Sequence, residues 1–285
     1  MKKIVFCILF LLSLSGCSRS PVLFKEARIA MDTFAEISVY SADRDSAHEA
    51  IRDAFREIER IEKVFNRFDS ASEVSRVNAL AGIEEVTISP ELFKIIEDSI
   101  YYSEISNGSF DITVAPQKKG RHEEVLLNKD NLSVRFMSPD IKMDFGGIVK
   151  GYAVDRARDT LIAHGIRDAL LNIGGNIYAM GNAGTKDGWI VGIQHPGDRN
   201  KIIDRLNLKD RAVSTSGNYQ RGTHIIDPAT GSPAEGIVAV TVVAHSAEEA
   251  DALSTAIFVM GKEKAAAFIK TLQAQENKDI EVFIL

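Results

Sequence analysis

The stretch Met143–Asp155, MDFGGIVKGYAVD, decides how we expect the rest of the chain to be arranged. It predicts a short strand at Met143-Asp144-Phe145, a turn at Gly146-Gly147 and then a helix with apolar residues at helical spacing. Asp144 and Lys150 flank the turn with one charge of each sign. A strand–glycine–helix junction presents backbone N–H groups at a helix N-terminus, so it can bind a phosphate. Glycine pairs at such junctions are also often plain turns, and both interpretations stay open at this point.

The beginning of the chain resembles a bacterial export signal. Met1-Lys2-Lys3 is basic, and Ile4–Leu14 is apolar but short for a membrane span. Leu14-Ser15-Gly16-Cys17 is similar to the lipobox of bacterial lipoproteins, with an ordinary secretory signal as the alternative. We therefore expect a signal peptide over residues 1–16, then a lipidated Cys17 and a tether to residue 26. The protein would be lipid-anchored in the bacterial cell envelope and face the periplasm or the outside.

The composition favours one folded domain over residues 27–285. The hydrophobic content of 45% is ample for a core. The net charge of −6 disfavours a nucleic-acid-binding surface. Cys7 lies in the expected leader, so the mature domain would have no disulfide.

Strand and helix signals follow one another without strict alternation, which predicts an α+β fold with a mixed sheet. We expect helices at Ala47–Phe65, at Pro90–Ser103 behind the N-cap Ser89, from Ser246 to Met260, and at Lys262–Leu272. We expect strands at Ala27–Tyr40, within Asn107–Pro116, and at Leu132–Met137, Ala169–Ile173, Trp189–Gln194, Ile202–Leu208, Ala212–Ser214, Ile237–His245 and Ile280–Leu285. Ser214–Gln220 reads as a polar loop.

The helix that begins at Ser246 carries a candidate cation site. Asp251 and Thr255 are four residues apart, so their oxygens share one helix face. Carboxylate, hydroxyl and backbone carbonyl oxygens are donors that Mg²⁺ accepts. The alternative is that Asp251 interacts with the helix dipole and Thr255 bonds to its own helix. The apolar residues around Asp251 favour burial, and a buried carboxylate needs a partner.

Eight short blocks, taken together, resemble the ApbE family of flavin transferases, also called FAD:protein FMN transferases. The blocks occur in the family's order and cover nearly all of the mature sequence. They are Met31-Asp32-Thr33, Asn66–Asn78, Phe110–Pro116, Asp144–Tyr152, Asn172–Asn176, Ser214–Gly217, His224–Gly231 and Ala250–Ala256. The resemblance implies mixed, largely antiparallel sheets flanked by helices.

The resemblance also implies a reaction. The family binds FAD and, with Mg²⁺, moves the FMN half onto a Thr or Ser hydroxyl of an acceptor protein, releasing AMP. Acceptors in the family are typically subunits of membrane redox complexes. We therefore expect FAD as the substrate and Mg²⁺ as the cofactor. A Mg²⁺-dependent FAD pyrophosphatase and a non-catalytic FAD-binding lipoprotein are the alternatives, and sequence barely separates the first from the transferase.

The matching positions give candidate site residues. The resemblance implies flavin contacts at Met31, Ser109, Phe110, Asp111, Asp144 and Lys150 and near Ile226, and metal ligands at Asp251, Thr255 and the backbone carbonyl of Gly147. Asn66 lies where some relatives have a flavin-contacting aromatic residue, so it is a further candidate.

A general base is needed for the incoming hydroxyl, and His224 is the first candidate because histidine titrates near neutrality. Asp251, acting through a metal-bound water, is the second. The alternative for His224 is a structural histidine at a turn. The other histidines read as surface or loop residues: His48, His122, His164, His195 and His245.

Three positions depart from the family pattern. Asp32 replaces the usual glycine after Met31, and Ser254 stands where some relatives place an additional acidic ligand. The segment between Pro116 and Met143 is short and polar, where relatives usually have a longer excursion. We expect this shortening to alter one wall of the flavin site or the surface that docks the acceptor.

Overall fold

The computed structural model describes residues 20–114, 118–184, 186–218, 224–274 and 279–285. The first half contains β1 (Val22–Ala30), β2 (Thr33–Ser41), α1 (Arg44–Phe65), α2 (Glu73–Leu80), β3 (Val86–Thr87), α3 (Pro90–Ile105), a 3₁₀ turn (His122–Glu124), β4 (Val125–Asn128) and β5 (Ser133–Phe136). The second half contains α4 (Val149–Ala163), β6 (Asp168–Ile173), β7 (Asn176–Met180), β8 (Trp189–His195), β9 (Asp198–Leu208), β10 (Arg211–Gly217), β11 (Ile226–Asp227), β12 (Ser232–Pro233), β13 (Ala239–Ala244), α5 (Ala247–Gln273) and β14 (Glu281–Ile284). In the described part of the chain, no helix is long and apolar enough to cross a membrane.

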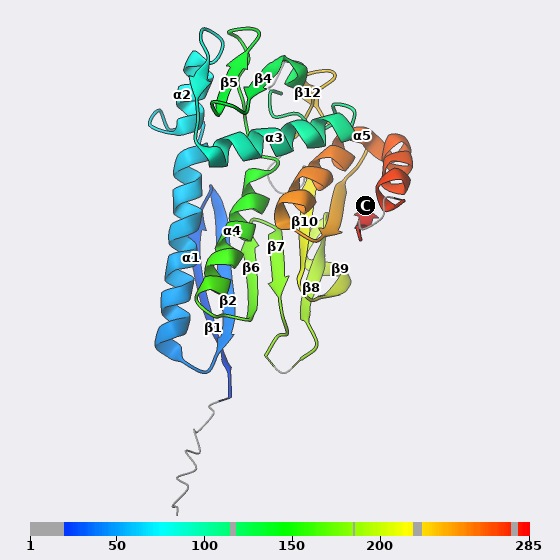
Figure 1. Cartoon of the computed structure of the whole chain (residues 1–285). Helices are drawn as coiled ribbons and strands as arrows, with labels where there is room; N and C mark the ends of the chain where they lie inside the picture. Colours follow the sequence, from blue (N-terminus) through cyan, green and yellow to red (C-terminus); the bar gives the residue numbers. More distant parts are fainter. Residues whose placement is uncertain (1–19, 115–117, 185, 219–223, 275–278) are drawn as a thin grey trace, which may run out of the picture.

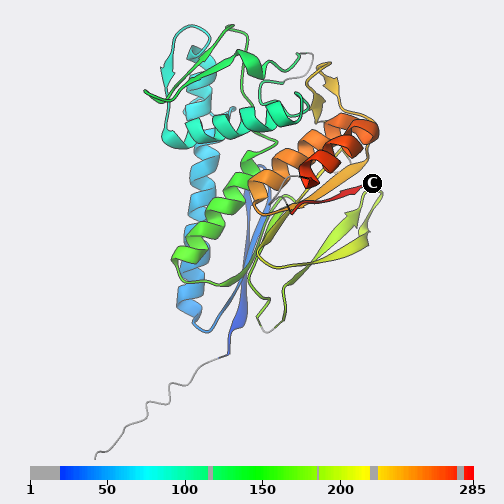
Figure 2. The same ribbon diagram turned by 45° about the vertical axis from the view of Figure 1, so that its right-hand side comes forward.

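A seven-stranded sheet in the order β1-β2-β6-β7-β10-β13-β14 is the centre of the molecule, and every neighbouring pair in it is antiparallel. Helices α1, α4 and α5 lie across one face of this sheet (Figures 1 and 2), where they bury the main core. The β8–β9 hairpin packs on the other face around Trp189. A small β3-β5-β4 sheet with α2 and α3 lies at one end, at the top of Figure 1. The predicted α+β class is confirmed.

Two predictions near the N-terminus are wrong. The expected single strand Ala27–Tyr40 is a hairpin, β1–β2, with a two-residue turn at Met31 and Asp32. Both turn residues have a positive φ, 53° and 55°, as a type I′ turn requires. The Met-Asp pair lacks the usual Asn-Gly signature, so the sequence pattern did not predict this turn. The folded body also begins before the expected boundary at residue 27, because β1 starts at Val22.

Three further assignments differ from the sequence prediction. Met143-Asp144-Phe145 is not a strand, because its amides bond outside any ladder: Met143 N donates to Asn78 Oδ1 and Asp144 N to the carbonyl of Ile112. The described part of Asn107–Pro116 is turns rather than a strand. Residues 214–217, expected in a loop, are the end of strand β10, which pairs with β13.

Helices α4 and α5 touch at Gly151. A Cβ at this position would lie 2.1 Å from the carbonyl oxygen of Ala247 and 2.7 Å from the amide nitrogen of Glu248, so only glycine fits. Asp155, one turn further along α4, accepts hydrogen bonds from the same two amides, at 3.0 Å from Ala247 and 2.9 Å from Glu248. These bonds satisfy N–H groups at the start of α5 that the helix itself leaves free. The first turn of α5 is therefore fixed by α4.

We predict that Gly151→Ala destabilises the protein, although glycine to alanine inside a helix normally stabilises it by about 0.5–1 kcal/mol. The added methyl group would push α5 away from α4, and overpacking of this kind costs about 1–3 kcal/mol. Thermal or urea unfolding measures the change. Gly197→Ala in the β8–β9 turn, where a Cβ would meet only the His195 side chain, is the matched control and should be near neutral. A Gly151→Ala protein as stable as the wild type would contradict the close contact.

Candidate active site

The N-terminal turn of α4 and the first half of α5 bring the candidate metal residues together. A Cβ at Gly147 would lie 3.2 Å from Thr255 Oγ1 and 3.2 Å from Phe110 Cε2, so these three residues are neighbours. Lys150 lies between two acceptors: its Nζ donates to the carbonyl of Gly146 and is 3.7 Å from Asp251 Oδ2. Residues far apart in sequence thus form one cluster, in which Asp251 and Thr255 lie four residues apart on α5.

Asp251 is 3% exposed, and burial raises the pKa of its carboxyl group. Three groups oppose this rise by favouring the charged form: the Lys150 ammonium, the Gly151 amide and the Asn176 side chain. Asp251 Oδ2 accepts the Gly151 N–H at 3.0 Å. The Asp251 carboxylate on α5 is therefore contacted by groups from both α4 and β7.

A chain of hydroxyl groups orients Thr255. Ser254 Oγ donates to the carbonyl of Asp251 at 3.0 Å, and a hydroxyl has only one proton to donate. Ser216, whose Oγ is 2.8 Å from Ser254 Oγ, must then be the donor in that pair. Ser216 Oγ is left to accept from Thr255 Oγ1, 3.4 Å away. Thr255 therefore keeps its oxygen lone pairs for a ligand.

These donors fit a hard divalent cation. Asp251 offers a carboxylate, Thr255 a hydroxyl oxygen, and Gly147 a backbone carbonyl on the adjoining turn, which are oxygen ligands of the kind Mg²⁺ prefers. No three His, Cys, Asp or Glu side chains gather as a metal site among the described residues. A cation here would thus depend on one carboxylate plus neutral oxygens, and Ser254 provides no second charge.

The junction before α4 uses most of its amides internally. The N–H groups of Ile148 and Val149 donate to the carbonyl of Phe145, and that of Gly146 donates to Asp144 Oδ1. The junction is thus less open to a phosphate than its sequence implied. Asp144 also forms an ion pair with Arg67, Nε to Oδ2 at 2.8 Å, on the loop that follows α1. This ion pair ties the loop containing Asn66 to the cluster.

Asp111 is the centre of a second set of contacts, close to Phe110. Its Oδ1 accepts from the Thr113 amide at 2.7 Å, and its Oδ2 lies 2.9 Å from Nδ1 of His122. The hydrogen bond and charge of Asp111 raise the pKa of His122 above its ordinary value of 6.5, against the effect of partial burial. The prediction that His122 is a surface or loop residue was wrong, because His122 is 8% exposed and fixes the candidate flavin turn.

We predict that the His122–Asp111 pair makes stability depend on pH. Because the folded-state pKa of His122 is raised, its stabilising contribution is complete below pH 6.5 and is lost as pH rises through the folded-state pKa. The His122→Gln variant should lack this part of the pH dependence, by about 1 kcal/mol. Urea unfolding between pH 5 and pH 9 measures the effect, with exposed His245→Gln as control. Parallel pH profiles for His122→Gln and wild type would contradict the charged pair.

The other predicted site residues lie on other turns and strands. Met31 is half-buried in the β1–β2 turn, Asn66 caps the C-terminus of α1 and accepts from the Phe68 amide at 2.9 Å, and Ser109 is half-buried beside Phe110. Ile226 begins β11, and His224 is exposed two residues before it. Gly120 links this region to Asp111, since its amide bonds the carbonyl of Pro228 and a Cβ there would strike Asp111. Cys17 and the expected signal peptide lie outside the described residues.

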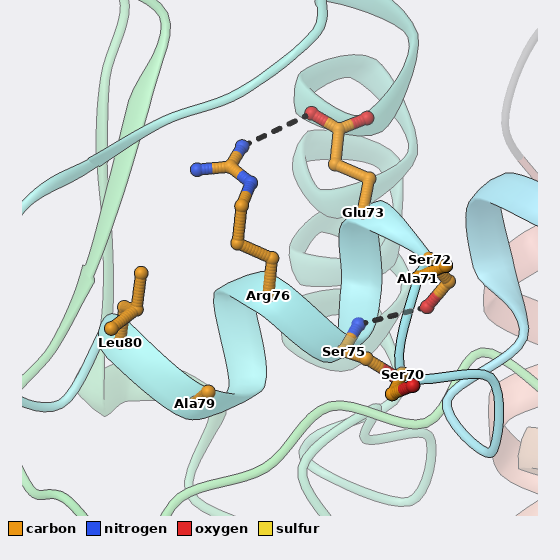
Figure 3. A pocket seen from close by; sticks show the side chains of 8 residues that line it. All are labelled: Ser70, Ala71, Ser72, Glu73, Ser75, Arg76, Ala79 and Leu80. Atoms are coloured by element: carbon orange, nitrogen blue, oxygen red, sulfur yellow. Dashed lines mark hydrogen bonds and ion pairs between the residues drawn. The ribbon is translucent and has the colours of Figure 1, made fainter.

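A surface pocket lies along α2 (Figure 3), and Ser75 in its lining donates to the carbonyl of Arg67. Its lining is Ser70, Ala71, Ser72, Glu73, Ser75, Arg76, Ala79 and Leu80, and none of the predicted site residues is among them. Glu73 and Arg76 form an ion pair across it at 3.7 Å. We assign the site to the cluster at α4 and α5, because the cluster combines a buried carboxylate, a lysine and oriented hydroxyls.

Sequence reasoning missed several residues that build the site. Arg67, His122, Ser216 and Asn176 received no role. Asn78 received none either, although its amide clamps Met143 on both sides, with Nδ2 to the carbonyl at 2.9 Å and Oδ1 from the amide at 2.7 Å. A signal was available for Asn78, since it follows the apolar Val74 and Val77 on the buried face of α2.

Comparison with known proteins gives one family. The ApbE family model matches residues 31–282 of the chain. A FAD:protein FMN transferase from Klebsiella pneumoniae (strain 342) is 27% identical over 296 residues, covering 92% of this chain and 89% of the relative. A protein of the same name from Treponema pallidum (strain Nichols) is 30% identical over 297 residues, covering 87% and 81%.

Solved structures of the family share the fold. The ApbE protein from Thermotoga maritima MSB8 superposes with a TM-score of 0.81 at 28% identity, covering 92% of this chain and 94% of that one. The flavin transferase ApbE from Vibrio cholerae also gives 0.81, at 23% identity, covering 93% and 97%. The α+β architecture with largely antiparallel sheets flanked by helices, predicted from the resemblance, is confirmed, and all strand pairs among the described residues are antiparallel.

Proposed function

This chain belongs to the ApbE family, and on that premise we propose that it is a FAD:protein FMN transferase that uses Mg²⁺ and a Thr or Ser acceptor. The observation that carries the proposal is the cluster of Asp251, Thr255 and Gly147 beside Phe110 and Lys150. It places oxygen donors for a cation and a positive side chain next to the turn where the family resemblance implies the flavin.

The proposed step replaces a phosphoanhydride bond of FAD with a phosphoester bond to the acceptor. The acceptor hydroxyl oxygen attacks the phosphorus on the FMN side of FAD, and the bond from that phosphorus to the bridging oxygen breaks. AMP leaves with the bridging oxygen, and the hydroxyl proton passes to a base, for which we propose His224. Magnesium, when bound, would neutralise charge that builds up on the phosphates. Asp251 and Thr255 would hold it, and Lys150 would position the pyrophosphate by its charge.

The acceptor and the cellular location are part of the proposal. We propose an acceptor subunit of a membrane redox complex, and lipid attachment at Cys17 in the bacterial cell envelope. The support for both is the lipobox-like sequence and the family resemblance.

We predict that the purified chain adds the mass of one FMN to an acceptor domain when FAD and Mg²⁺ are present. Asp251→Ala should abolish this gain, since it removes the single carboxylate of the cation site; a loss of at least 100-fold in rate is expected. Mass spectrometry of the acceptor and chromatography of released AMP are the measurements. Asp198→Asn, in the distant β8–β9 hairpin, is the matched control and should retain the wild-type rate.

The outcomes of this assay separate the alternatives. Free FMN and AMP beside an unmodified acceptor would favour the pyrophosphatase and call for a second acceptor. FAD that stays intact with and without Mg²⁺ would contradict both enzymes and leave a FAD-binding protein.

We predict that His224→Ala slows transfer while FAD still binds. A base acts on the proton of the incoming hydroxyl, so its loss should lower kcat by about 10²–10⁴-fold and leave KM for FAD nearly unchanged. His245→Ala is the control. Equal loss of kcat and of FAD affinity would instead indicate a structural role at the β11 turn.

A further inference from the structure

A buried amide oxygen without a hydrogen-bond partner lies beside Asp251. It is Oδ1 of Asn176, a residue that is 3% exposed. Among the residues that the structure describes, this atom and Oδ1 of Asn218 are the buried side-chain oxygens or nitrogens that have no partner. Leaving such an acceptor unsatisfied in the interior is unfavourable, so a group that it normally binds is expected.

The position of Asn176 in β7 places its side chain on the face of the sheet that the helices cover. Side chains alternate between the two faces of a strand. Tyr178 and Met180, two and four residues further on, pack in the core beneath the helices, whereas Ile177 packs against the β8–β9 hairpin. Asn176 therefore shares the face of Tyr178 and Met180, on which α4 and α5 lie.

The amide group of Asn176 has a defined orientation. Its nitrogen donates to the Asp251 carboxylate, which helps to keep that carboxylate charged, and lies 3.5 Å from the carbonyl of Ile173. Turning the amide over would place its oxygen against the carboxylate, which is repulsive. Nitrogen and oxygen are bonded to one carbon, so the unpartnered oxygen belongs to the amide group that contacts Asp251 and is available to bind a ligand.

We propose that Asn176 is a further ligand of the cation site, with Oδ1 as a fourth protein oxygen beside Asp251, Thr255 and the carbonyl of Gly147. The inference rests on the Mg²⁺ site of the proposed function. An amide oxygen is a neutral hard donor of the kind that such cations accept, directly or through one of their waters. It also supplies a ligand where Ser254 provides no acidic group. The Asn176 amide thereby has both roles: its nitrogen holds Asp251 and its oxygen meets the cation.

The test measures cation binding rather than catalysis. Mn²⁺, a paramagnetic substitute for Mg²⁺, is titrated into the purified chain with and without FAD, and free Mn²⁺ is followed by electron paramagnetic resonance. Asn176→Leu should raise the Mn²⁺ dissociation constant about tenfold, equivalent to about 1.4 kcal/mol. Asn176→Asp keeps an oxygen and adds charge, so it should bind Mn²⁺ at least as tightly as the wild type.

Asn172→Leu is the matched control. Asn172 lies in the same hairpin but faces the other side of the sheet, and its Oδ1 already accepts the Gly175 amide at 2.9 Å. This variant should lose some stability and keep its affinity for Mn²⁺. Circular dichroism and Tm are recorded for all variants. If Asn176→Leu does not fold, Asn176→Asp still tests the proposal, since saturating Mn²⁺ should raise its Tm more than that of the wild type.

Several results would contradict the proposed role of Asn176. Wild-type affinity for Mn²⁺ in Asn176→Leu, or a Tm loss that is equal with and without Mn²⁺, would overturn the inference and leave Asn176 with a structural role. Weaker FAD binding without a change in Mn²⁺ affinity would also overturn it, in favour of a flavin hydroxyl as the bound group. A wild-type chain that binds no Mn²⁺ would overturn the Mg²⁺ requirement of the proposed function as well.

Discussion

The close approach of α4 and α5 at Gly151 is the constraint on which the site depends. One turn of α4 has three roles: Gly151 lets the helices touch, the Gly151 N–H donates to Asp251, and the Asp155 carboxylate accepts the first amides of α5. Asp251 and Thr255 lie one and two turns further along α5, so their distance from the turn at Gly147 is set by this contact. A shift of α5 would therefore change the cation site and the core together.

The polar groups around Asp251 compensate for a site with one carboxylate. A second acidic ligand would attract a cation more strongly, but two buried carboxylates repel each other when no cation is bound. Ser254 avoids this repulsion and uses its hydroxyl to connect Asp251 with Ser216. The resulting site is neutralised by Lys150 when no cation is bound. Cation affinity then depends on how well neutral oxygens are positioned, which is a property of the packing around them.

The sequence predicted the parts of the structure that depend on local pattern. The helix stripe of Ala47–Phe65 and the Ser246 cap of α5 follow from residue spacing, and the structure has both, with Ser246 Oγ accepting the Glu249 amide at 3.1 Å. The i, i+4 rule also placed Asp251 and Thr255 on one face. The prediction missed the turn at Met31, because its two residues adopt a positive φ although neither is the glycine or asparagine that usually marks such a turn.

Contacts between segments far apart in the chain could not be predicted from residue spacing. No spacing rule relates His122 to Asp111, or Arg67 to Asp144, because each pair meets through loops whose course depends on the whole fold. Asn176 shows the difference most clearly. The sequence placed it after a Gly-Gly turn, but only the register of β6 with β7 decides which face of the sheet it occupies.

The segment between Pro116 and Met143 contacts the candidate flavin turn. It contains the 3₁₀ turn, β4 and β5. Arg121 pairs with Glu124 and Asp140 inside the segment, and His122 contacts Asp111 outside it. The second contact reaches the turn that holds Phe110, whose ring lies beside Gly147. The segment is thus tied directly to the candidate flavin turn by the hydrogen bond between His122 and Asp111. Because a buried hydrogen-bonded pair of this kind tolerates little movement, we infer that it holds the segment rigidly against this turn.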